Sequence, residues 1–480
     1  MQSTQVKPDI KLNWQQQQAL EFVVDQVLNS PNKYIGLYGT AGTGKTVTAR
    51  YILEALASRM DKDRFLAITP TNSACKTLNK SFKGGTIRPD VITIASALRK
   101  KRVITESGGQ DFVIEDEPSI NDPFCDRYNP LEKVELLLGD ELSMSSKYDM
   151  QKINDNLSYR AKVLVMMDIY QLFPPNENSI YAQEMVGNNF YQLTKTERYA
   201  EGSNIYKVIT AAQQAVEHKN FNFNIMSAFP NSFPDGDKGA GYFVHGNENL
   251  GVMSFARQVK LMLAAQSWDY TRCVCWRNKI VDRVNFAVRQ AIVPYGDQRS
   301  ATPGELFITT GVVKRSAKGL ETTLYQTATQ LVIEQANPRK IADNDGDEWI
   351  IWDAVVYDPD DDIFNKPVHH NVTILDQYDR ERFEAKLNNL GNSITVAAKE
   401  FGYKSFNWWK VYNHKEAFMS LVDPIRPSYA VTGYNAQGKS YKVMYVNYWH
   451  DIRFDRRDPD RRNRTVFVGA SRAMKQLNIF

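Results

Sequence analysis

The sequence predicts an α/β fold with two parallel-sheet domains, and three observations lead to that prediction. Residues 12 to 195 alternate strand-like runs, such as "FLAITPT", "VELLLGD" and "AKVLVMMD", with helical stretches. A second unit of this kind begins at residues 269 to 292 and resumes at residues 427 to 449. A glycine-rich turn joins an apolar strand at residues 34 to 38 to a helix-forming run at residues 47 to 60. Parallel strands need helical crossovers, so this alternation favours a parallel sheet.

Composition and charge argue against a membrane protein, a zinc- or disulfide-stabilised protein and a strongly basic protein. The chain has 480 residues, of which 42% are hydrophobic and 24% charged, which is enough for more than one soluble domain. A net charge of +4 permits a nucleic-acid partner but is weaker than that of a strongly basic protein. The cysteines, Cys75, Cys125, Cys273 and Cys275, form no C-x-x-C pair, so we expect reduced thiols and no structural zinc. Without a signal core or a membrane-length apolar run, we expect a cytoplasmic protein with no membrane partner.

The stretch "YIGLYGTAGTGKTVTAR" carries a phosphate-binding loop. Gly39, Gly44, Lys45 and Thr46 fit the pattern G-x-x-x-x-G-K-[ST] between a strand and a helix. Main-chain N–H groups of such a loop surround the phosphates, the lysine reaches the terminal phosphates, and the threonine hydroxyl binds Mg²⁺. We therefore expect ATP and Mg²⁺ as cofactors. The loop residues expected to bind the nucleotide are Gly39, Thr40, Ala41, Gly42, Thr43, Gly44, Lys45 and Thr46.

A pair of carboxylates follows the next apolar strand of this domain. "VELLLGDELSM" ends its apolar run in Asp140 and Glu141. Asp140 would hold Mg²⁺ through water, and Glu141 would polarise the attacking water. Together with the phosphate-binding loop, this pair predicts hydrolysis of the nucleotide rather than binding alone.

Two further segments interrupt the α/β pattern. In "KKRVITESGGQDFVIEDE", β-rich runs at residues 103 to 105 and 112 to 114 flank a Ser-Gly-Gly turn, which predicts a protruding hairpin. Residues 300 to 400 hold short β-rich runs broken by Asp, Gly and Pro, which suggests a small barrel. Within that region we interpret the acidic run at residues 358 to 362 as a solvated loop. His369 and His370 we interpret as loop residues.

The remaining motifs resemble those of superfamily 1 helicases. "VLVMMDIYQLFPP", with Asp168 and Gln171, looks like their G-D-x-x-Q-L-P-P element. "FVGASRAMKQL" resembles their closing V-A-x-[ST]-R-A element and supplies Arg472. "YAVTGYNAQGKS" is similar to their T-x-H-K-x-Q-G-x-[ST] element, with matches at Thr432, Gln437, Gly438 and Ser440.

Three other stretches extend this resemblance to most of the chain. "LNWQQQQA" matches the Q-motif and makes Gln16 the adenine reader, and "LTKTER" places Arg198 at the motif IV arginine. "ITPTNSACKTL" matches the first strand-binding motif. The order of the motifs, and the hairpin before Asp140, most resemble the 5′-to-3′ subgroup that contains RecD and bacteriophage Dda. The resemblance runs from about residue 12 to 477 and is weakest at residues 210 to 260 and 300 to 400.

The resemblance implies two RecA-like P-loop motor domains with a pin hairpin and a small β-barrel-like, SH3-like insert. The first motor domain would span residues 1–195 and include the pin at 100–130. The second would comprise 196–300 and 421–480, with the insert at 301–420. The implied activity is an ATP-hydrolysing DNA helicase that translocates 5′ to 3′ on single-stranded DNA and unwinds duplexes in replication or recombination.

The resemblance also implies the residues and partners of this activity. The catalytic set would be Lys45, Thr46, Asp140, Glu141, Gln171, Arg198, Gln437 and Arg472, with Gly438 and Gln16 also binding nucleotide and Thr46 and Asp140 holding the metal. The DNA-binding set would be Pro70, Thr71, Asn72, Thr93, Ser96, Phe112, Asn278, Thr432, Tyr434 and Asn435. Partners would be single-stranded and forked DNA, with a single-strand-binding protein or replication and recombination proteins. A monomer is implied, in the host bacterial cytoplasm if the chain is phage-encoded.

The chain departs from the family pattern at three positions. Tyr434 and Asn435 stand where the family usually has His-Lys, and Met167 replaces the glycine before Asp168. Tyrosine can stack or donate a hydrogen bond, but the positive charge of the lysine near a phosphate is lost.

Several alternatives stay open at this point. An RNA helicase or nucleoprotein remodeller of the same superfamily, a non-hydrolysing single-strand-binding protein and a small-molecule P-loop kinase are the rival functions. Phe112 would be either a wedge at the duplex fork or half of a cross-strand pair. Four aromatic residues could stack on bases, although core packing is favoured for most of them: Trp276, Phe406, Trp408 and Trp409.

Overall fold

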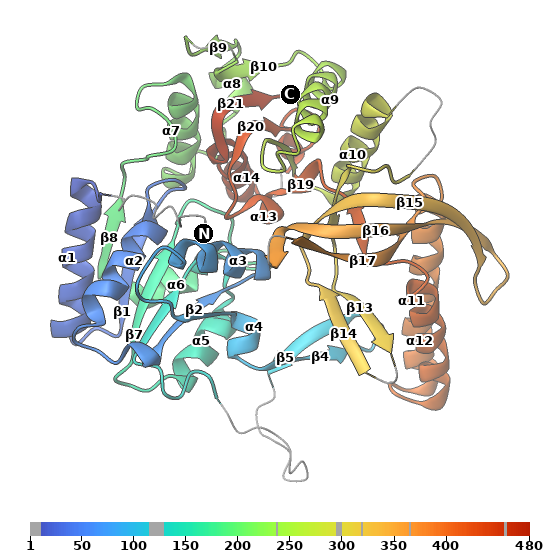
Figure 1. Ribbon diagram of the computed structural model, residues 1–480, viewed down its shortest axis with the longest axis horizontal. Coiled ribbons are helices and arrows are strands. Elements are labelled where there is room, and N and C mark those ends of the chain that lie inside the picture. The colour runs from blue at the N-terminus through green and yellow to red at the C-terminus, as the bar shows by residue number, and fades with distance from the viewer. Residues whose placement is uncertain are drawn as a thin grey trace.

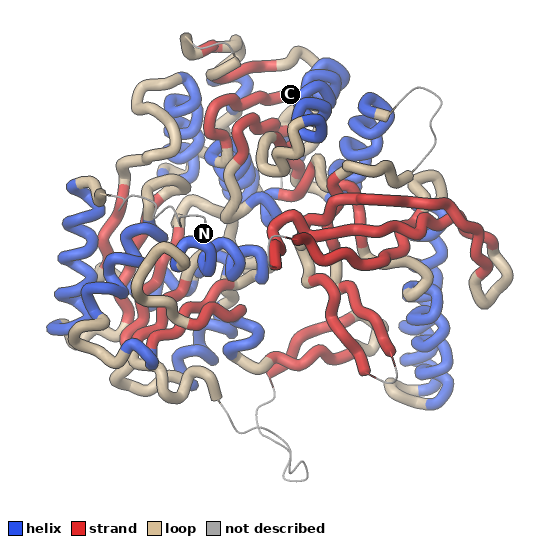
Figure 2. Tube along the Cα trace, in the orientation of Figure 1, coloured by secondary structure: helices blue, strands red, loops and turns tan. Residues whose placement is uncertain are grey.

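A computed structural model of the chain describes residues 11–114, 129–236, 239–293, 300–317, 320–363, 366–455 and 458–480. Two α/β domains lie one above the other in Figure 1, and a strand-rich insert with two long helices lies beside them. Figure 2 shows that the longest strands of the molecule belong to this insert. The α/β fold class with two parallel-sheet domains is confirmed. Among the described residues, no helix combines the length and apolar character needed to cross a membrane.

The first domain is built on a parallel six-stranded sheet with the order β3-β2-β6-β7-β1-β8. All residues of the strand Tyr34–Gly39 are buried, because helices cover both faces of the sheet. The strands are β1 Tyr34–Gly39, β2 Phe65–Thr69, β3 Asp90–Thr93, β6 Leu136–Gly139, β7 Lys162–Met167 and β8 Phe190–Leu193. The helices are α1 Trp14–Asn29, α2 Lys45–Leu56, α3 Asn72–Phe82, α4 Ile94–Ala97, α5 Lys147–Asn156 and α6 Tyr181–Val186, with short 3₁₀ turns η1 Lys62–Arg64 and η2 Leu142–Met144.

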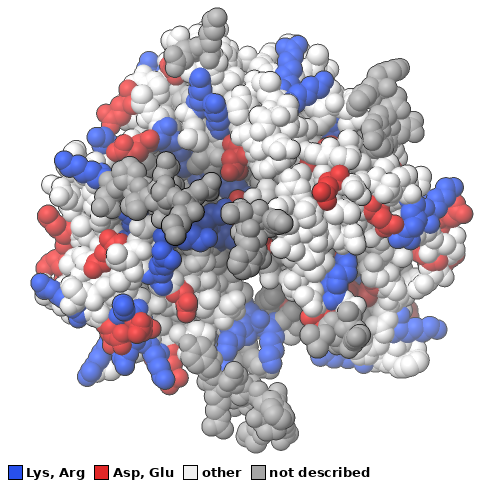
Figure 3. Space-filling model, in the orientation of Figure 1, with Lys and Arg blue, Asp and Glu red and all other residues white. Residues whose placement is uncertain are grey.

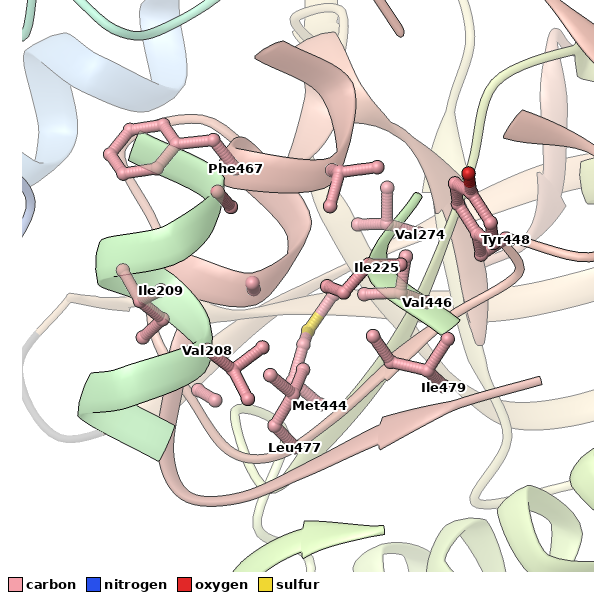
Figure 4. Close-up of a cluster of buried hydrophobic side chains, with 14 of the residues drawn as sticks. Val208, Ile209, Ile225, Val274, Met444, Val446, Tyr448, Phe467, Leu477 and Ile479 are labelled. Carbon is pink, nitrogen blue, oxygen red and sulfur yellow. The ribbon is translucent and has the colours of Figure 1, made fainter. Parts of the chain in front are cut away.

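The second domain has a six-stranded sheet with the order β19-β11-β20-β21-β10-β9, parallel except for β9. Side chains of α7, α14 and this sheet meet in one apolar cluster (Figure 4). The strands are β9 Phe233–Pro234, β10 Gly241–Val244, β11 Thr271–Cys275, β19 Ala430–Thr432, β20 Tyr441–Val446 and β21 Ala473–Ile479. The helices are α7 Asn204–Glu217, α8 Ile225–Ala228, α9 Glu248–Ala264, α10 Asn278–Ile292, α13 Gly433–Ala436 and α14 Pro459–Ser471, with η3 Ile452–Phe454.

The insert combines an antiparallel five-stranded sheet, in the order β17-β16-β15-β12-β18, with a two-stranded hairpin and a helix pair. Residues 380 to 419, which the sequence placed in a β-rich region, form the two helices. The strands are β12 Leu306–Thr309, β13 Val313–Ala317, β14 Leu320–Tyr325, β15 Gln330–Ala342, β16 Glu348–Ile363, β17 Lys366–Leu375 and β18 Ile425–Pro427. The helices are α11 Arg380–Phe401 and α12 Phe406–Met419.

Two local interpretations of the insert are wrong. The acidic run at residues 358 to 362 belongs to β16, and the side chain of Asp358 is only 4% exposed because it pairs with Lys76 of α3 at 2.5 Å. His369 and His370 lie on β17, where they pair with Tyr357 and Val356 of β16. Neither segment is a loop, since antiparallel pairing over these strands is a long-range interaction that the local composition does not reveal.

Candidate active site and nucleic-acid interface

The phosphate-binding loop joins β1 to α2 as the sequence predicts. Gly42 and Gly44 have φ values of 88° and 84°, a left-handed conformation that glycine adopts readily. A Cβ on Gly42 would lie 2.6 Å from the Cβ of Arg198, so this glycine also permits the close approach of the arginine. Lys45 Nζ donates to the carbonyl of Gly39 at 2.7 Å. The lysine is therefore held over the loop, at the N-terminus of α2.

A cavity of about 250 Å³ lies over this loop, between the two α/β domains. Most of the predicted catalytic and nucleotide-binding residues line it together: Ala41, Gly42, Gly44, Lys45, Thr46, Asp140, Glu141, Gln171, Arg198, Gly438 and Arg472. Val47, Ala74 and Thr77, which the sequence did not single out, also line it. Gly39, Thr40, Thr43, Gln16 and Gln437 are not among the lining residues. The cavity thus collects groups from both domains around one phosphate-binding loop.

Asp140 and Glu141 follow the end of β6 and face this cavity. Burial and the neighbouring Glu141 carboxylate raise the pKa of Asp140 to about 7, although Lys45 partly opposes the shift. Glu141 has a φ of 55°, and its N–H donates to Asp140 Oδ1 at 3.0 Å. A buried carboxylate with a raised pKa gains from a nearby cation. The oxygen donors of Asp140 and Thr46 in one cavity fit Mg²⁺, which prefers oxygen ligands.

Gln171 connects the carboxylate of one domain to the arginine of the other. In the amide orientation that satisfies its neighbours, its Nε2 donates to Glu141 Oε2 at 3.1 Å, and its Oε1 accepts from Arg472 Nη2 at 3.1 Å. The nitrogen also lies 3.2 Å from the carboxamide of Gln437. Gln171 is 1% exposed, and the buried Asp168, whose pKa is raised by burial, begins the same turn. Gln171 therefore contacts three other predicted catalytic residues, Glu141, Gln437 and Arg472.

Two arginines reach the cavity from different parts of the chain. Arg198 lies between β8 and α7, and its Nη1 donates to the carbonyl of Ser471 at 2.5 Å. Arg472, at the end of α14, is 1% exposed, and its Nε donates to the carbonyl of Val468 at 3.2 Å. Burial and the positive charge of Arg472 lower the pKa of Arg198 to about 10. Two cations placed this close fit a site that receives a highly charged anion.

Gln16 lies behind the phosphate-binding loop. Its Nε2 donates to the carbonyl of Thr43 at 3.1 Å, and its Oε1 accepts from the N–H of Asn13 in a capping box at the start of α1. The neighbouring Gln15 accepts from the N–H groups of Thr194 and Lys195 at 3.0 and 2.9 Å. The predicted adenine reader therefore supports the loop, while Gln15 joins α1 to the segment that carries Arg198.

The predicted strand-binding residues lie at the ends of several elements. Pro70, Thr71 and Asn72 lead into α3, where Thr71 caps the helix by accepting from the N–H of Ala74. Thr93 caps α4, and its hydroxyl lies 2.9 Å from that of Ser96. In the second domain, Asn278 begins α10 and accepts from Arg426 at 3.2 Å, while Thr432 and Asn435 lie at the start of α13 and within it.

Tyr434 has a different surrounding from the other predicted strand-binding residues. Its hydroxyl donates to the carbonyl of Phe173 at 3.1 Å, and burial raises its pKa. The side chain thus links α13 of the second domain to the segment that follows β7 of the first.

The predicted hairpin consists of β4 Lys100–Ile104 and β5 Gln110–Ile114 and docks on the helix pair of the insert. Trp408 Nε1 donates to the carbonyl of Glu106 at 3.0 Å, and Lys415 Nζ donates to the carbonyl of Gly108 at 3.0 Å. The hydroxyl of Tyr403 donates to the carbonyl of Ile104. The side chain of Phe112, and residues 115 to 128 of the predicted pin, lie outside the described residues.

The aromatic candidates separate into core and surface residues. Trp408 is fully buried and stacks on Tyr412 with ring centroids 5.2 Å apart, so it packs the helix pair rather than facing solvent. Trp409 packs edge-on against Trp408, and Trp276 packs against the core of the second domain. Phe406, in contrast, is 85% exposed. Core packing, which was expected for most of the four aromatic residues, is therefore confirmed for the three tryptophans, and Phe406 is the exception.

Arg464 of α14 is an interdomain residue that sequence reasoning missed. Its Nη1 donates to the carbonyls of Ile169 and Gln171, both at 2.8 Å, and its guanidinium carbon lies 3.9 Å from the ring centroid of Phe173. The run "RRNR" at residues 461 to 464 offers several arginines, and only the position on the folded helix selects this one.

Figure 3 shows Lys and Arg side chains gathered around a hollow near the centre of the visible face.

Comparison with known proteins gives matches over the first domain and over the whole chain. A family model described as an AAA domain matches residues 23–176. The ATP-dependent DNA helicase Dda of Enterobacteria phage T4 is 25% identical over 56% of this chain and 55% of that protein. An uncharacterized protein of Acanthamoeba polyphaga mimivirus is 22% identical over 97% of this chain and 99% of its own.

Solved structures with a similar chain course include two Pif1 helicases. The Bacteroides Pif1 structure bound to single-stranded DNA is 15% identical and has a TM-score of 0.45. The match covers 98% of this chain and 92% of the Pif1 chain. The Candida albicans Pif1 structure is 14% identical and has a TM-score of 0.44. The match covers 98% of this chain and 94% of the Pif1 chain.

Proposed function

We propose how this chain works from the premise that it belongs to superfamily 1 of the helicases, in the 5′-to-3′ group with Dda. It is an ATP-hydrolysing DNA helicase, and its motor moves 5′ to 3′ along single-stranded DNA. The observation that carries the proposal is the contact of Gln171 with Glu141 and Arg472 at 3.1 Å each. This contact joins the hydrolytic carboxylate of one motor domain to an arginine of the other.

The charged and amide side chains of the cavity have distinct roles in the proposed hydrolysis. Lys45 neutralises the terminal phosphates, and Glu141 orients the water that attacks the γ-phosphate. Arg198 and Arg472 stabilise the negative charge that develops on the transferred phosphoryl group. Gln171 senses whether that group is present, because it contacts both Glu141 and Arg472.

Thr46 and Asp140 would hold Mg²⁺, whose charge stabilises the β- and γ-phosphate oxygens when it is bound. Gly438 and the residues of the phosphate-binding loop complete the nucleotide site. Gln16 and Gln437 act behind it, as supports of the loop and of Gln171.

The cycle of cleft opening and closing would move the strand. The residues predicted to bind the strand lie on both domains, at the starts of α3 and α4 in the first and of α10 and α13 in the second. A change in the angle between the domains therefore changes the distance between two grips on the same strand. The docked hairpin would separate the duplex ahead of the motor. The hydroxyl of Tyr434 donates to the carbonyl of Phe173, so this residue would contact the strand through its ring.

We also propose a cellular setting for this motor. The motor acts as a monomer on single-stranded and forked DNA in replication or recombination, with a single-strand-binding protein or replication and recombination proteins as partners. Expression from a phage gene would place it in the cytoplasm of the host bacterium. These roles rest on the family likeness and on the Dda relative.

The proposal is tested by comparing how strongly single-stranded DNA and RNA stimulate ATP turnover. ATP turnover by the purified chain should rise at least about tenfold on addition of single-stranded DNA, and less on addition of an RNA oligonucleotide of equal sequence. Stronger stimulation by RNA would assign the chain to the RNA remodellers of the superfamily. Turnover that no nucleic acid stimulates would contradict a translocating motor.

A further inference from the structure

Side chains of the second domain donate hydrogen bonds to the main chain of the segment Ile169–Phe173 in the first domain. This segment carries Gln171, and three of its carbonyl groups accept hydrogen bonds from the second domain. Arg464 donates to the carbonyls of Ile169 and Gln171 at 2.8 Å, and Tyr434 donates to that of Phe173 at 3.1 Å. Main-chain contacts of this kind fix where the segment lies, whatever its side chains are.

Side-chain packing strengthens the same grip. The guanidinium carbon of Arg464 lies 3.9 Å from the centroid of the Phe173 ring, which is within the range of cation–π contacts. Tyr170 is 7% exposed and packs edge-on against Phe467 of α14, inside the apolar cluster of the second domain. A Cβ on Gly433 would lie 3.2 Å from Leu172, so α13 also approaches the segment closely.

The orientation of Arg464 is itself fixed. Its Nε donates to Asp460 Oδ2 at 2.9 Å, one turn earlier on α14, and its side chain is only 11% exposed. Arg464 lies within α14, and Arg472 lies at its C-terminal end. A movement of α14 relative to the first domain therefore shifts both arginines. One arginine then contacts the main chain of Gln171 and the other its side chain.

We propose that Arg464 and Tyr434 are positioning residues for hydrolysis, which hold Gln171 against Glu141 only when the two motor domains close. The inference rests on the proposed function, since it assigns how closure reaches the hydrolytic carboxylate. Neither side chain lines the nucleotide cavity. Loss of the grip should therefore slow turnover without weakening the binding of ATP.

The first test compares arginine variants on one helix. With saturating single-stranded DNA, Arg464→Ala should lower kcat for ATP about tenfold to a hundredfold, while KM for ATP stays within about twofold. Arg464→Lys should recover part of the loss, because an ammonium can donate to the same carbonyls but lacks the second nitrogen that binds Asp460 and the plane that packs on Phe173. Arg462→Ala is the matched control, because that side chain donates to the carbonyl of Phe221 and not to the segment. Its kcat should equal that of the parent.

The second test uses a milder variant and its combination. Tyr434→Phe removes only the hydroxyl that reaches Phe173, so the fold is retained and kcat should fall a few-fold. If both residues hold one segment, the double variant Arg464→Ala/Tyr434→Phe should lose little more than Arg464→Ala alone. This coupling separates positioning from general destabilisation, which would give additive losses.

The outcomes distinguish this inference from the proposed function. A parent protein without DNA-stimulated ATP turnover would overturn the proposed function itself. An active parent with unchanged kcat in Arg464→Ala and Tyr434→Phe would overturn only the positioning role. Equal losses in KM and kcat, or fully additive losses in the double variant, would also overturn it.

Discussion

Arg198 donates a hydrogen bond to the carbonyl of Ser471 at 2.5 Å, which places its guanidinium beside the end of α14 and beside Arg472. The pKa of Arg198 is lowered to about 10 by burial and by the charge of Arg472. Two arginines that disfavour each other's charge gain when a phosphate anion enters between them. The site therefore favours a bound phosphate anion over an empty cavity.

Arg198→Ala and Arg472→Ala should each lower kcat for ATP by about a thousandfold, because an arginine of this kind acts on the charge of the transferred phosphoryl group. KM for ATP should change far less, since an arginine finger acts mainly on the transition state. Steady-state ATPase kinetics with saturating single-stranded DNA measure both constants. Losses that appear equally in KM and in kcat would indicate ground-state binding roles instead.

Lys45→Ala should abolish ATP turnover, because the terminal phosphates lose their main counterion. Glu141→Gln should bind nucleotide like the parent but hydrolyse it too slowly to detect, since the amide cannot accept a proton from water. Fluorescent-nucleotide binding and phosphate release separate the two effects. Near-parental turnover in either variant would remove the assignment of this cavity as the hydrolytic site.

Replacement of residues 103 to 114 by a short Gly-Ser loop should leave DNA-stimulated ATPase intact and strongly reduce unwinding. The hairpin lies apart from the nucleotide cavity, and its loss leaves about 1.4 kcal/mol of stacking per base-pair step unopposed. Lys415→Ala, which removes only one contact to the hairpin turn, should show a milder form of the same separation. Unwinding at the parental rate would mean that the hairpin is not a wedge. A joint loss of ATPase would mean that it supports the motor fold.

The ion pair between Lys76 and Asp358 joins α3 of the first domain to β16 of the insert, and it should stabilise the folded chain. Asp358 is 4% exposed, so Lys76→Ala leaves a buried carboxylate without its main partner, at a cost of about 1–3 kcal/mol. Lys80→Ala is the control, because its pair with Asp360 is exposed and contributes below about 1 kcal/mol. Denaturant unfolding compares the two variants. Equal effects would contradict the argument from burial.

Asp343 should make the stability of the insert depend on acid pH. Burial alone would raise its pKa, but hydrogen bonds from Lys386, from the Trp349 indole and from main-chain N–H groups lower it to about 2. Since the pKa of an unfolded aspartate is about 3.9, the ionised group stabilises the fold above about pH 4. That contribution is lost as the pH falls from about 4 toward 2. Asp343→Asn should lower Tm at about pH 7 and lose less on acidification, and a parental Tm would contradict this.

The sequence predicted those parts of the site whose geometry is local. The phosphate-binding loop follows from glycines that must adopt left-handed conformations between a buried strand and a helix, as Gly42 and Gly44 do. Asp140, Glu141 and Arg472 follow from motifs next to apolar strands or helices. Asp140 and Glu141 lie in the cavity because the ends of parallel strands meet at one edge of the sheet, whereas Arg472 reaches it from the end of α14 in the second domain.

Other features depend on partners that are distant in sequence. Asp358 lies in a strand because β16 pairs with β15 and β17, and its side chain pairs with Lys76, which is 282 positions away. The acidic neighbours of Asp358 gave no sign of either interaction. The helices α11 and α12 bury few of their residues, so their apolar periodicity is weak. The main-chain contacts of Arg464 and Tyr434 could not be predicted, because a carbonyl group offers the same acceptor in every sequence.

The most direct test of a 5′-to-3′ DNA helicase is strand displacement on duplexes that carry either a 5′ or a 3′ single-stranded tail. With ATP and Mg²⁺, the parent chain should separate the 5′-tailed duplex, and the Glu141→Gln variant should separate neither substrate. The 3′-tailed duplex should stay intact under the same conditions. Efficient unwinding from the 3′ tail alone would contradict the proposed polarity, and no unwinding of either duplex would contradict the proposed helicase.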